Sequence, residues 1–500
     1  MSEMSTIEAV LQGIDVRQNL SRLRQEIKNT NTVEKRELKR RLIQEKESML
    51  CLLTDEDAKT RKNVALLIGD LALQSFLSPL LDAYQAETQR FVKTSYLKAV
   101  KSLDYKDYLP LFKECREKLL GEELSADNKK HIEEELQCLN DLIILKEGMK
   151  RHRYHGTDVQ TECIFMTNKQ YLYVLQNQIE QVDEHAEFLP FAAGVRVLTK
   201  RLVDLLPLRT YRELLFVIPG MKVCESDPQK AAERIAHSDL LAFIKRTHDG
   251  TPPYYFRLEV KSHMTLDEKS TFTKKLSRGI EELSGRTLLN STSHYEFEIR
   301  LIENKEHTFN VLLKLYTIKD DRFEYRKEYL SSSIKPVNAA LLVQLASDYM
   351  ISDAQVLDPF CGVGTMLIER QKVIKANTSY GIDSSKEAIL KARENTEAAG
   401  QVIHYINRDF FDFKHEYLFD EIFTNMPYAC GYVTQESIRE LYISFFGTAS
   451  LVLTKRGRIL MLTHDLPLAI PCAAKNQYRL IEKWEISKTE MTYLVIFEKE

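Results

Sequence analysis

The sequence lacks the cysteine spacing that builds disulfide scaffolds or zinc sites. Its eight cysteines stand far apart, no two of them form a C-x-x-C pair, and none clusters with histidine. Such patterns mark secreted disulfide frameworks and structural metal sites. We therefore expect free thiols, a reducing compartment and no bound metal. The cysteines are Cys51, Cys115, Cys138, Cys163, Cys224, Cys361, Cys430 and Cys472.

The sequence also lacks an excess of positive charge and any long apolar run. Its formal net charge is −3, so a nucleic-acid partner has to be held by local basic patches rather than by the overall field. No run approaches the roughly 20 apolar residues that a membrane helix needs. The N-terminus lacks the basic-then-apolar layout of a secretory signal. These absences predict a cytoplasmic protein without a membrane partner.

The chain has 500 residues, a length that suggests about three domains of roughly 150 residues each. Residues 1–150 predict an all-α domain. Its apolar positions Val64 and Ile68 return about 32 residues later at Tyr96 and Val100. A repeat of this length made of helix pairs is typical of HEAT-type solenoids, although two units are also compatible with a plain helical bundle. Solenoid surfaces bind partners, so we expect a protein partner on this domain.

Residues 151–330 show short strand signals between helical ones, which predicts an α+β domain. The domain opens on the polar stretch 150–156, where we expect His152 and His155 to lie in a solvated basic loop. Strands are expected at residues 163–167, 171–175, 214–218 and 254–260, and helices near residues 192–206 and 228–243.

The last third of the chain is organised around residues 356–369. An apolar run ends at Asp358, a tight turn with Gly362 and Gly364 follows, and an amphipathic helix then begins. The glycines allow backbone angles and a close ligand approach that a Cβ atom would forbid, and the helix start favours an anionic group. A strand, a glycine turn and a helix predict a nucleotide-sized pocket at the carboxyl edge of a parallel sheet. The Gly-Lys-Ser/Thr sequence of a phosphate-binding loop does not follow.

This motif, Asp-Pro-Phe-Cys-Gly-x-Gly-Thr, resembles the cofactor motif of S-adenosylmethionine-dependent methyltransferases. More narrowly, it resembles the RNA methyltransferases that carry a THUMP domain. The resemblance implies S-adenosyl-L-methionine as the cofactor and a Rossmann-like α/β domain with a seven-strand sheet whose last strand is antiparallel. The motif residues that the resemblance assigns to cofactor binding are Asp358, Pro359, Phe360, Gly362, Gly364 and Thr365.

Two acidic residues follow the next two expected strands. Asp383 ends the strand 379–382 about 20 residues after the glycine turn, where a carboxylate can accept hydrogen bonds from ribose hydroxyls. Farther along, Asp409 matches the methyltransferase residue that receives the adenine amino group. The resemblance also lets Phe410 flank the adenine ring, and Asp412 competes with Asp409 for the amino group.

A fourth expected strand ends in Asn425-Met426-Pro427-Tyr428. This resembles the (Asn/Asp)-Pro-Pro-(Tyr/Phe) motif of amino-group methyltransferases, with Met426 in the place of the first proline. The Asn425 side-chain oxygen and the Met426 carbonyl, turned inward by the rigid Pro427, can hold the protons of an exocyclic amine. Tyr428 can stack on a base taken out of its helix. The resemblance therefore makes Asn425, Pro427 and Tyr428 the catalytic residues, unless the motif is only a tight turn after a buried strand.

Residues 254–316 carry a second resemblance. Their order of strand, helix, strand and strand is similar to the latter half of a THUMP domain, which in that family holds RNA, chiefly the 3′ end of tRNA. The basic helix 267–283 suits phosphate contacts and the aromatic residues 254–256 suit base stacking, while a solvated helix beside core aromatics is the structural alternative. Candidates for substrate contacts are Lys274, Lys275 and Arg278 in this helix and Arg326 in the following linker.

These patterns predict a multidomain protein with a helical HEAT-like domain (1–150), a THUMP-like α+β RNA-binding domain (151–330) and a Rossmann-like methyltransferase domain (331–500). The expected reaction moves a methyl group to a purine exocyclic amine, with guanosine N2 in tRNA as the preferred target. Adenine N6, ribosomal RNA and a glutamine amide in a protein are alternative acceptors. A non-catalytic RNA-binding or scaffold protein that works through its helical domain is the alternative from another class, and Met426 leaves it open.

Overall fold

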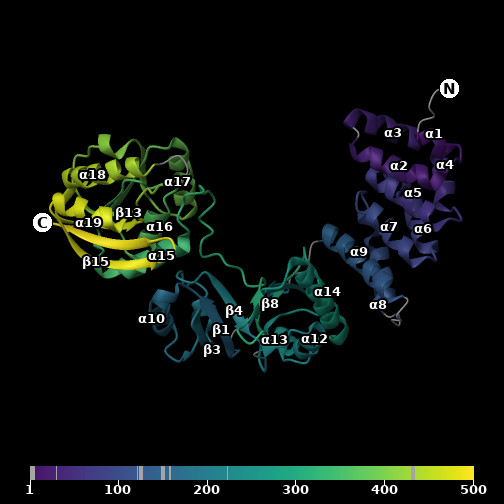
Figure 1. The fold of residues 1–500 in the computed structure, drawn as a ribbon, viewed down its shortest axis with the longest axis horizontal. Coiled ribbons are helices and arrows are strands. Elements are labelled where there is room, and N and C mark those ends of the chain that lie inside the picture. Colours follow the sequence, from purple (N-terminus) through teal and green to yellow (C-terminus); the bar gives the residue numbers. More distant parts are fainter. Residues whose placement is uncertain are drawn as a thin grey trace. The chain divides into compact units, whose positions relative to one another are not determined.

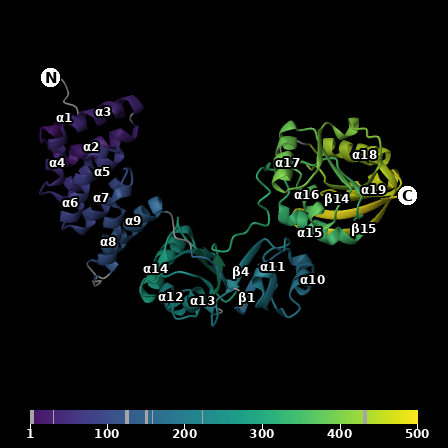
Figure 2. The ribbon, with the colours of Figure 1, turned by 180° about the vertical axis from the view of Figure 1, so that it is seen from behind.

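The computed structural model describes residues 6–29, 31–120, 122, 128–147, 152–156, 159–221, 223–429 and 434–500. The chain divides into two compact units, Met1–Arg151 and His152–Glu500. Figure 1 shows their helices and strands, and Figure 2 shows the same elements from behind. No helix in the described ranges is long and apolar enough to cross a membrane. The seven cysteines within these ranges are free thiols.

The first unit is helical throughout its described residues. Two of its helix pairs repeat with one offset: α5 and α7 begin at residues 58 and 90, and α6 and α8 begin at residues 77 and 109, which is 32 residues in both cases. A short 3-10 turn precedes the second helix of each pair. The helices are α1 (Thr6–Leu11), α2 (Val16–Asn29), α3 (Thr32–Gln44), α4 (Lys46–Leu53), α5 (Ala58–Asp70), α6 (Leu77–Ala86), α7 (Arg90–Val100), α8 (Leu109–Leu120) and α9 (Lys129–Glu147).

The second unit begins with a mixed sheet in the order β2-β3-β1-β4-β9-β8-β6-β7, with β5 pairing on β9. Five helices bury apolar side chains against one face of it. The strands are β1 (Thr161–Met166), β2 (Glu187–Leu189), β3 (Gly194–Thr199), β4 (Glu213–Val217), β5 (Val223–Cys224), β6 (Tyr254–Lys261), β7 (Leu288–Asn290), β8 (Phe297–Glu303) and β9 (Phe309–Leu315). The helices are α10 (Leu172–Val182), α11 (Leu202–Leu205), α12 (Pro228–Ala236), α13 (Leu240–Thr247) and α14 (Leu266–Leu283).

Two sequence-based expectations are wrong here. The strand expected at residues 171–175 is the start of helix α10, because Asn168 accepts the Gln170 N–H at the entry turn and the buried positions recur at helical spacing. The helix expected at residues 192–206 contains strand β3, which alternates buried and half-buried residues. Gly194 allows this strand to lie close to its neighbour, because a Cβ atom there would stand 2.5 Å from the Phe165 carbonyl oxygen.

The polar stretch before β1 is exposed at His155, as its composition predicts, but the expectation of a solvated side chain is wrong for His152. The His152 side chain is 9% exposed, and its Nδ1 lies 2.9 Å from a carboxylate oxygen of the fully buried Glu296. This carboxylate raises the pKa of His152 above its ordinary value, against the opposing effect of burial. The expectation of aromatic stacking is also wrong for Tyr254 and Phe256, which are 1% and 0% exposed and belong to the core of the mixed sheet.

The second unit ends in a seven-stranded sheet of order β12-β11-β10-β13-β14-β16-β15. The pairs from β12 to β14 are parallel, and β16 runs antiparallel to both of its neighbours. The strands are β10 (Gln355–Asp358), β11 (Thr378–Asp383), β12 (His404–Asn407), β13 (Phe419–Asn425), β14 (Leu453–Thr463), β15 (Tyr478–Ser487) and β16 (Thr492–Lys499). The helices are α15 (Pro336–Ala346), α16 (Thr365–Val373), α17 (Lys386–Ala398), α18 (Gln435–Val452) and α19 (Leu466–Lys475).

Helices cover both faces of this sheet, because successive strand residues point to opposite sides. Val356 packs with α15, α16 and α17, whereas the next residue, Leu357, packs with α18 and α19. Strand β10 lies between β11 and β13, so the chain reverses its direction of travel across the sheet at β10. Ligands of open α/β sheets bind in the crevice at the carboxyl ends of the strands at such a reversal.

Candidate active site

The turn between β10 and α16 is held in one conformation by its neighbours. Gly362 and Gly364 both have positive φ angles, +52° and +81°. The Gly362 N–H donates to Asp383 Oδ2 at 2.9 Å, and the Gly364 N–H donates to the Cys361 carbonyl at 2.8 Å. A Cβ atom at Gly362 would meet nothing within 4 Å, so this glycine faces open space.

Gly364 is required for packing inside the domain and does not line the cavity. A Cβ atom on Gly364 would stand 2.2 Å from the hydroxyl oxygen of Tyr405 on β12. The neighbouring strand has the same requirement, because a Cβ atom on Gly381 would stand 2.7 Å from the Tyr405 ring. The Tyr405 hydroxyl is itself bonded to Thr396 Oγ1 at 2.8 Å and is buried. Because Gly364 and Gly381 have no Cβ atom, the Tyr405 side chain of β12 can pack against both of them.

Asp358 lies beneath the turn and does not line the cavity. It is 0% exposed, and its Oδ1 accepts hydrogen bonds from the Phe360 N–H at 3.1 Å and the Thr424 hydroxyl at 2.6 Å. Its Oδ2 has no hydrogen-bond partner among the described residues. Burial raises the pKa of this carboxyl to about 7, against the lowering effect of the two donors, and the nearby Asp383 charge raises it further.

Asp383 stands at the carboxyl end of β11 and lines the cavity. One oxygen accepts the Gly362 N–H, and the other accepts the Ser385 N–H at 2.8 Å. These two bonds orient the carboxylate and leave its remaining lone pairs available toward the cavity. The helix that follows, α17, is capped by Ser385, whose hydroxyl accepts the Ala388 N–H at 3.3 Å.

Asp409 and Phe410 lie at the end of β12 and both line the cavity. Asp409 caps a short 3-10 turn by accepting the Phe411 N–H at 3.0 Å, and its side chain is exposed. Phe410 is 2% exposed and packs against Phe360, with ring centroids 6.0 Å apart. Asp412, the competing candidate for Asp409, is exposed and is not among the lining residues.

The Asn-Met-Pro-Tyr stretch ends β13 at the opposite wall. Asn425, Pro427 and Tyr428 all line the cavity, and the Asn425 Oδ1 atom is buried without a partner among the described residues. The Tyr428 ring stacks on His464, with centroids 4.1 Å apart and planes 27° from parallel. Burial lowers the pKa of His464, partly offset by Glu490, so the imidazole is neutral near pH 7.

The contacts of Met426 explain why a methionine can stand where the motif usually has its first proline. Its N–H donates to the Leu462 carbonyl of β14 at 3.0 Å, which extends the pairing of β13 and β14 by one residue. A proline has no N–H and cannot make this bond. The Met426 side chain is 0% exposed and fills the core beneath α18. The methionine therefore completes a strand pair and does not obstruct the cavity.

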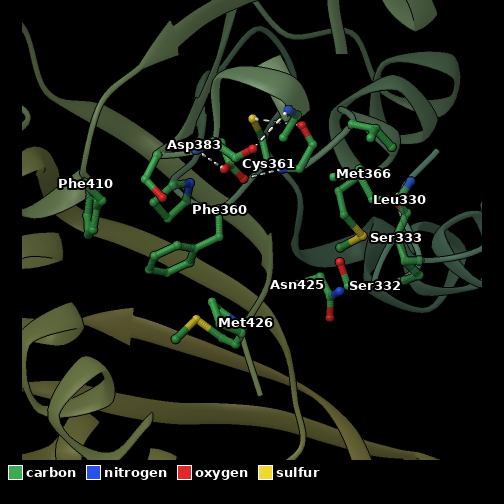
Figure 3. A pocket seen from close by; sticks show the side chains of 18 of the residues that line it. Leu330, Ser332, Ser333, Phe360, Cys361, Met366, Asp383, Phe410, Asn425 and Met426 are labelled. Carbon is green, nitrogen blue, oxygen red and sulfur yellow. Dashed lines mark hydrogen bonds between the residues drawn. The ribbon is translucent and has the colours of Figure 1, made fainter. Parts of the chain in front are cut away.

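These segments enclose one cavity of about 720 Å³. In Figure 3, Asp383, Phe360 and Phe410 lie toward one side, whereas Leu330, Ser332, Ser333 and Met366 lie toward the other. Ten of the twelve expected catalytic and cofactor residues line it, and the two that do not are Asp358 and Gly364. The ten are Pro359, Phe360, Gly362, Thr365, Asp383, Asp409, Phe410, Asn425, Pro427 and Tyr428.

The candidate RNA-contacting residues lie elsewhere. Lys274, Lys275 and Arg278 are exposed on α14, and Arg278 pairs with Glu282 at 3.0 Å. Arg326 is half-buried, and its guanidinium lies 5.7 Å from the Tyr329 ring centroid. Its Nε is buried without a partner in the described part of the chain, and burial lowers the pKa of the guanidinium. None of the four lines the cavity.

The sequence reasoning missed two parts of the site. Residues 330–334, which precede α15, all line the cavity, although their side chains are three serines between two apolar residues and carry no chemical signature. His464 was also missed, because nothing in its local pattern distinguishes it from an ordinary loop residue. The one sequence signal for residues 330–334 is that Ser333, Ile334 and Pro336 stand as in the Ser-Ile-x-Pro element that precedes the cofactor motif in THUMP-bearing methyltransferases.

Comparisons with known proteins bear on this part of the chain. Residues 324–489 match the family model described as RMKL-like, methyltransferase domain. The crystal structure of TrmN from Thermus thermophilus is 20% identical, covers 68% of this chain and 100% of its own, and superposes with a TM-score of 0.52. A predicted N6-adenine-specific DNA methylase from Listeria monocytogenes is 16% identical, with 68% and 97% covered and a TM-score of 0.53. SMU.472, crystallised with SAH, is 13% identical, with 68% and 98% covered and a TM-score of 0.52.

At these identities the structural likenesses show the fold. The match of residues 324–489 to the RMKL-like methyltransferase model, beside this fold, indicates a methyltransferase with S-adenosylmethionine as its cofactor. The cavity fits such a group, because its volume falls within the about 300–1,000 Å³ typical of small-molecule sites. Its polar atoms fit as well: Thr365 Oγ1 and Asn425 Oδ1, both on residues that line the cavity, are buried without partners within the described ranges.

Proposed function

We propose that this protein methylates a purine exocyclic amine in RNA, with N2 of a guanosine in tRNA as the preferred target. The observation that carries the proposal is the buried Asn425 Oδ1 atom, which has no partner in the described structure and lies on the cavity that Asp383 and Asp409 also line. A buried polar atom without a partner costs free energy, so such atoms are rare unless a ligand satisfies them.

The ends of β11 and β12 are suited to hold the nucleoside part of the cofactor. Asp383 is oriented by the Gly362 and Ser385 N–H groups, so its remaining lone pairs can accept the ribose hydroxyls. Asp409 lines the same cavity and can accept from the adenine amino group, and the Phe360 and Phe410 rings can supply apolar walls. When bound, S-adenosylmethionine supplies an electrophilic methyl group.

The end of β13 is suited to hold the acceptor amine. An exocyclic amine is a poor nucleophile while its lone pair is conjugated with the purine ring. Asn425 Oδ1 and the Met426 carbonyl can each accept one of its two protons, which turns the lone pair toward the methyl group. The amine nitrogen gains the methyl group and then loses one proton to water, because an asparagine side chain cannot act as a base. Alignment in the cavity supplies much of the rate enhancement.

Tyr428 is suited to receive the base. One face of its ring is covered by His464, and a flipped base can stack on the other face. The neutral imidazole extends the aromatic stack without placing a charge beside the base. Base stacking on an aromatic side chain contributes about 1–3 kcal/mol, enough to hold an extruded nucleotide while the amine reacts.

The middle part of the chain supports an RNA substrate. Its order of β6, α14, β7, β8 and β9 resembles, apart from the three-residue β7, the strand, helix, strand and strand order of the latter half of a THUMP domain. Lys274 and Lys275 are exposed on α14 and are available for phosphates. We assign RNA binding to this part and partner binding to the helical unit, whose 32-residue repeat supports a HEAT-like solenoid.

The decisive experiment incubates the full-length protein with S-adenosylmethionine that carries a labelled methyl group, in the presence of tRNA, rRNA and protein pools. We expect label in tRNA, and nucleoside mass spectrometry should find N2-methylguanosine. Label only in the protein pool would refute the RNA proposal. N6-methyladenosine would support the alternative acceptor, which the fold of the Listeria protein makes worth testing.

Two variants separate binding from chemistry. Asp383→Ala should abolish binding of S-adenosylhomocysteine in a calorimeter, because it removes both the proposed ribose acceptor and the acceptor of the Gly362 N–H. Asn425→Ala should leave that binding intact and lower kcat by a factor of about 100 or more, the usual loss when one preorganised polar contact to the transition state is removed. Normal turnover in Asn425→Ala would contradict the proposed role of this residue.

A further inference from the structure

Asn395 is a buried side chain that connects three parts of the methyltransferase domain. It lies on α17, is 0% exposed, and makes three hydrogen bonds. Its Oδ1 accepts the Glu328 N–H at 2.9 Å, and its Nδ2 donates to the Glu328 carbonyl at 2.9 Å and to the Val363 carbonyl at 3.1 Å. Glu328 belongs to the linker before α15, and Val363 belongs to the glycine turn after β10.

A carboxamide presents a donor and an acceptor side by side, so it can pair with both backbone groups of a single residue. Asn395 does this with Glu328, as a neighbouring strand would. A second contact from the same helix face acts alongside it, because Lys391, four residues earlier, donates to the Tyr329 carbonyl at 3.2 Å. Side chains four residues apart lie on one face of a helix. Helix α17 is therefore hydrogen-bonded to two successive linker residues, Glu328 and Tyr329.

Glu328 and Tyr329 immediately precede residues 330–334, which we call the strap. All five strap residues line the cavity that also holds Asn425. Two hydrogen bonds join Leu330 and Ser333 within the strap. The Leu330 N–H donates to Ser333 Oγ at 2.9 Å, and the Ser333 N–H donates to the Leu330 carbonyl at 3.0 Å. Figure 3 shows Leu330, Ser332 and Ser333 on the side of the cavity away from Asp383. After the strap, the buried Pro336 begins α15.

We propose that Asn395 is a positioning residue for methyl transfer, which locks the strap to the glycine turn so that both walls of the cavity keep their spacing. The proposal rests on the function proposed above. Asn395 does not line the cavity, so its effect on ligands has to pass through Glu328 and Val363. Three bonds from one side chain cost less ordering entropy than three separate contacts, which makes this amide an efficient lock.

The test changes the Asn395 amide into a carboxylate of nearly the same shape. Asn395→Asp retains an acceptor for the Glu328 N–H but turns the donor that faces two carbonyl oxygens into a carboxylate oxygen. Gln401→Glu is the matched control, because Gln401 Nε2 donates to the Ile368 carbonyl at 3.2 Å, in the same domain but away from the strap. Both variants are amide-to-acid changes that remove donors to backbone carbonyls.

In the full-length protein, we expect Asn395→Asp to weaken binding of S-adenosylhomocysteine about tenfold by calorimetry, the equivalent of about 1.4 kcal/mol. Trypsin cleavage after Lys327, which is exposed just before the strap, should become faster by a similar factor. Gln401→Glu should change neither, even if both variants lower the melting temperature. Parallel changes in the two variants would overturn the proposal, because they would show a general loss of stability.

A pH series adds a readout that a purely structural role would not move. A buried aspartic acid takes up a proton more readily than a free one and then regains one donor. The ratio of the Asn395→Asp and wild-type affinities should therefore be closer to one at pH 6 than at pH 8, and a ratio that does not change with pH would count against the proposal.

If Asn395→Asp does not fold, Lys391→Met provides the second variant. It removes the bond to the Tyr329 carbonyl together with the ion pairs of Lys391 to Glu387 at 2.7 Å and Glu328 at 4.0 Å, and we expect a two- to threefold effect on the same two readouts. Failure of the wild-type protein to bind S-adenosylhomocysteine would instead refute the proposed function. The proteolysis without ligand would still decide whether Asn395 anchors the strap, and unchanged cleavage in both strap variants would refute that anchoring.

Discussion

The acid beneath the glycine turn predicts an unusual pH dependence of stability. Asp358 is fully buried, and burial raises the pKa of its carboxyl from 3.8 to about 7. Below pH 3.8 the folded and unfolded states both hold the proton. Between pH 3.8 and about 7 the unfolded chain loses the proton whereas the folded chain keeps it, so stability falls as the pH rises through this window. Above about pH 7 both states are ionised and the loss is complete.

The size of the effect follows from the width of the window. Each unit of pKa difference corresponds to about 1.4 kcal/mol, so the two pH units between 5 and 7 destabilise the folded domain by about 3 kcal/mol through this single group. Asp358→Asn removes the titration and keeps an oxygen that can accept from Thr424 and Phe360. For a domain of this size, 1 kcal/mol shifts the melting temperature by about 2–4 °C.

The assay is calorimetric unfolding of the ligand-free wild-type and Asp358→Asn proteins at pH 5 and pH 8. We expect the variant to gain about 6–12 °C relative to the wild type between pH 5 and pH 8. Other titrating groups contribute equally to both proteins and cancel in this comparison. Asp412→Asn, a change at an exposed acid near the same cavity, should show no such gain. An equal difference between wild type and Asp358→Asn at both pH values would refute the reasoning.

Three further substitutions test the glycine turn, a buried ion pair and the proposed stacking of a base on Tyr428. Gly364→Ala should cost about 2 kcal/mol or more in thermal unfolding, because it combines a φ of +81° with a Cβ atom 2.2 Å from the Tyr405 hydroxyl, and adding Tyr405→Phe should recover part of that loss. Arg370 Nε and Glu421 Oε1 form an ion pair at 2.6 Å with both side chains 0% exposed, so Arg370→Leu should cost about 3–5 kcal/mol in the same assay because it leaves the buried carboxylate without a charged partner. Tyr428→Leu should raise KM for RNA about tenfold and leave the calorimetric affinity for S-adenosylhomocysteine unchanged, because it removes the proposed stacking surface alone.

The cavity wall was predictable from the sequence where the relevant signals are local. Asp383 and Asn425 end the strands β11 and β13, Gly362 lies in the turn after β10, and the carboxyl ends of parallel strands meet at one edge of a sheet. Their convergence follows from strand order alone. Asp412 is placed three residues beyond Asp409 in the sequence, and only the 3-10 turn after Asp409 decides which of the two acids faces the cavity.

The failures arise where contacts distant in sequence decide the outcome. The stretch 171–175 is rich in residues that favour strands, yet its burial pattern in three dimensions is helical. His152 looks like part of a solvated basic loop, and its partner Glu296 is 144 residues away. The Ser333-Ile334 similarity does not predict where the strap lies, because its place at the cavity depends on Asn395 on helix α17. Such pairings leave no periodic trace in a single sequence.

The glycine turn is held from four directions, and each contact comes from a different element. Asp383 on β11 accepts its N–H, Tyr405 on β12 packs against it, Asn395 on α17 binds its carbonyl, and Thr424 on β13 bonds to the acid at its base. A turn fixed in this way loses little further freedom when a ligand binds, which removes one cost of association. The same arrangement keeps Asp358 dry and raises its pKa, so rigidity of the turn and instability of the empty site above pH 5 have a common structural cause. It follows that the substitution expected to stabilise the ligand-free domain most at high pH, Asp358→Asn, lies directly beneath the turn on which cofactor binding depends.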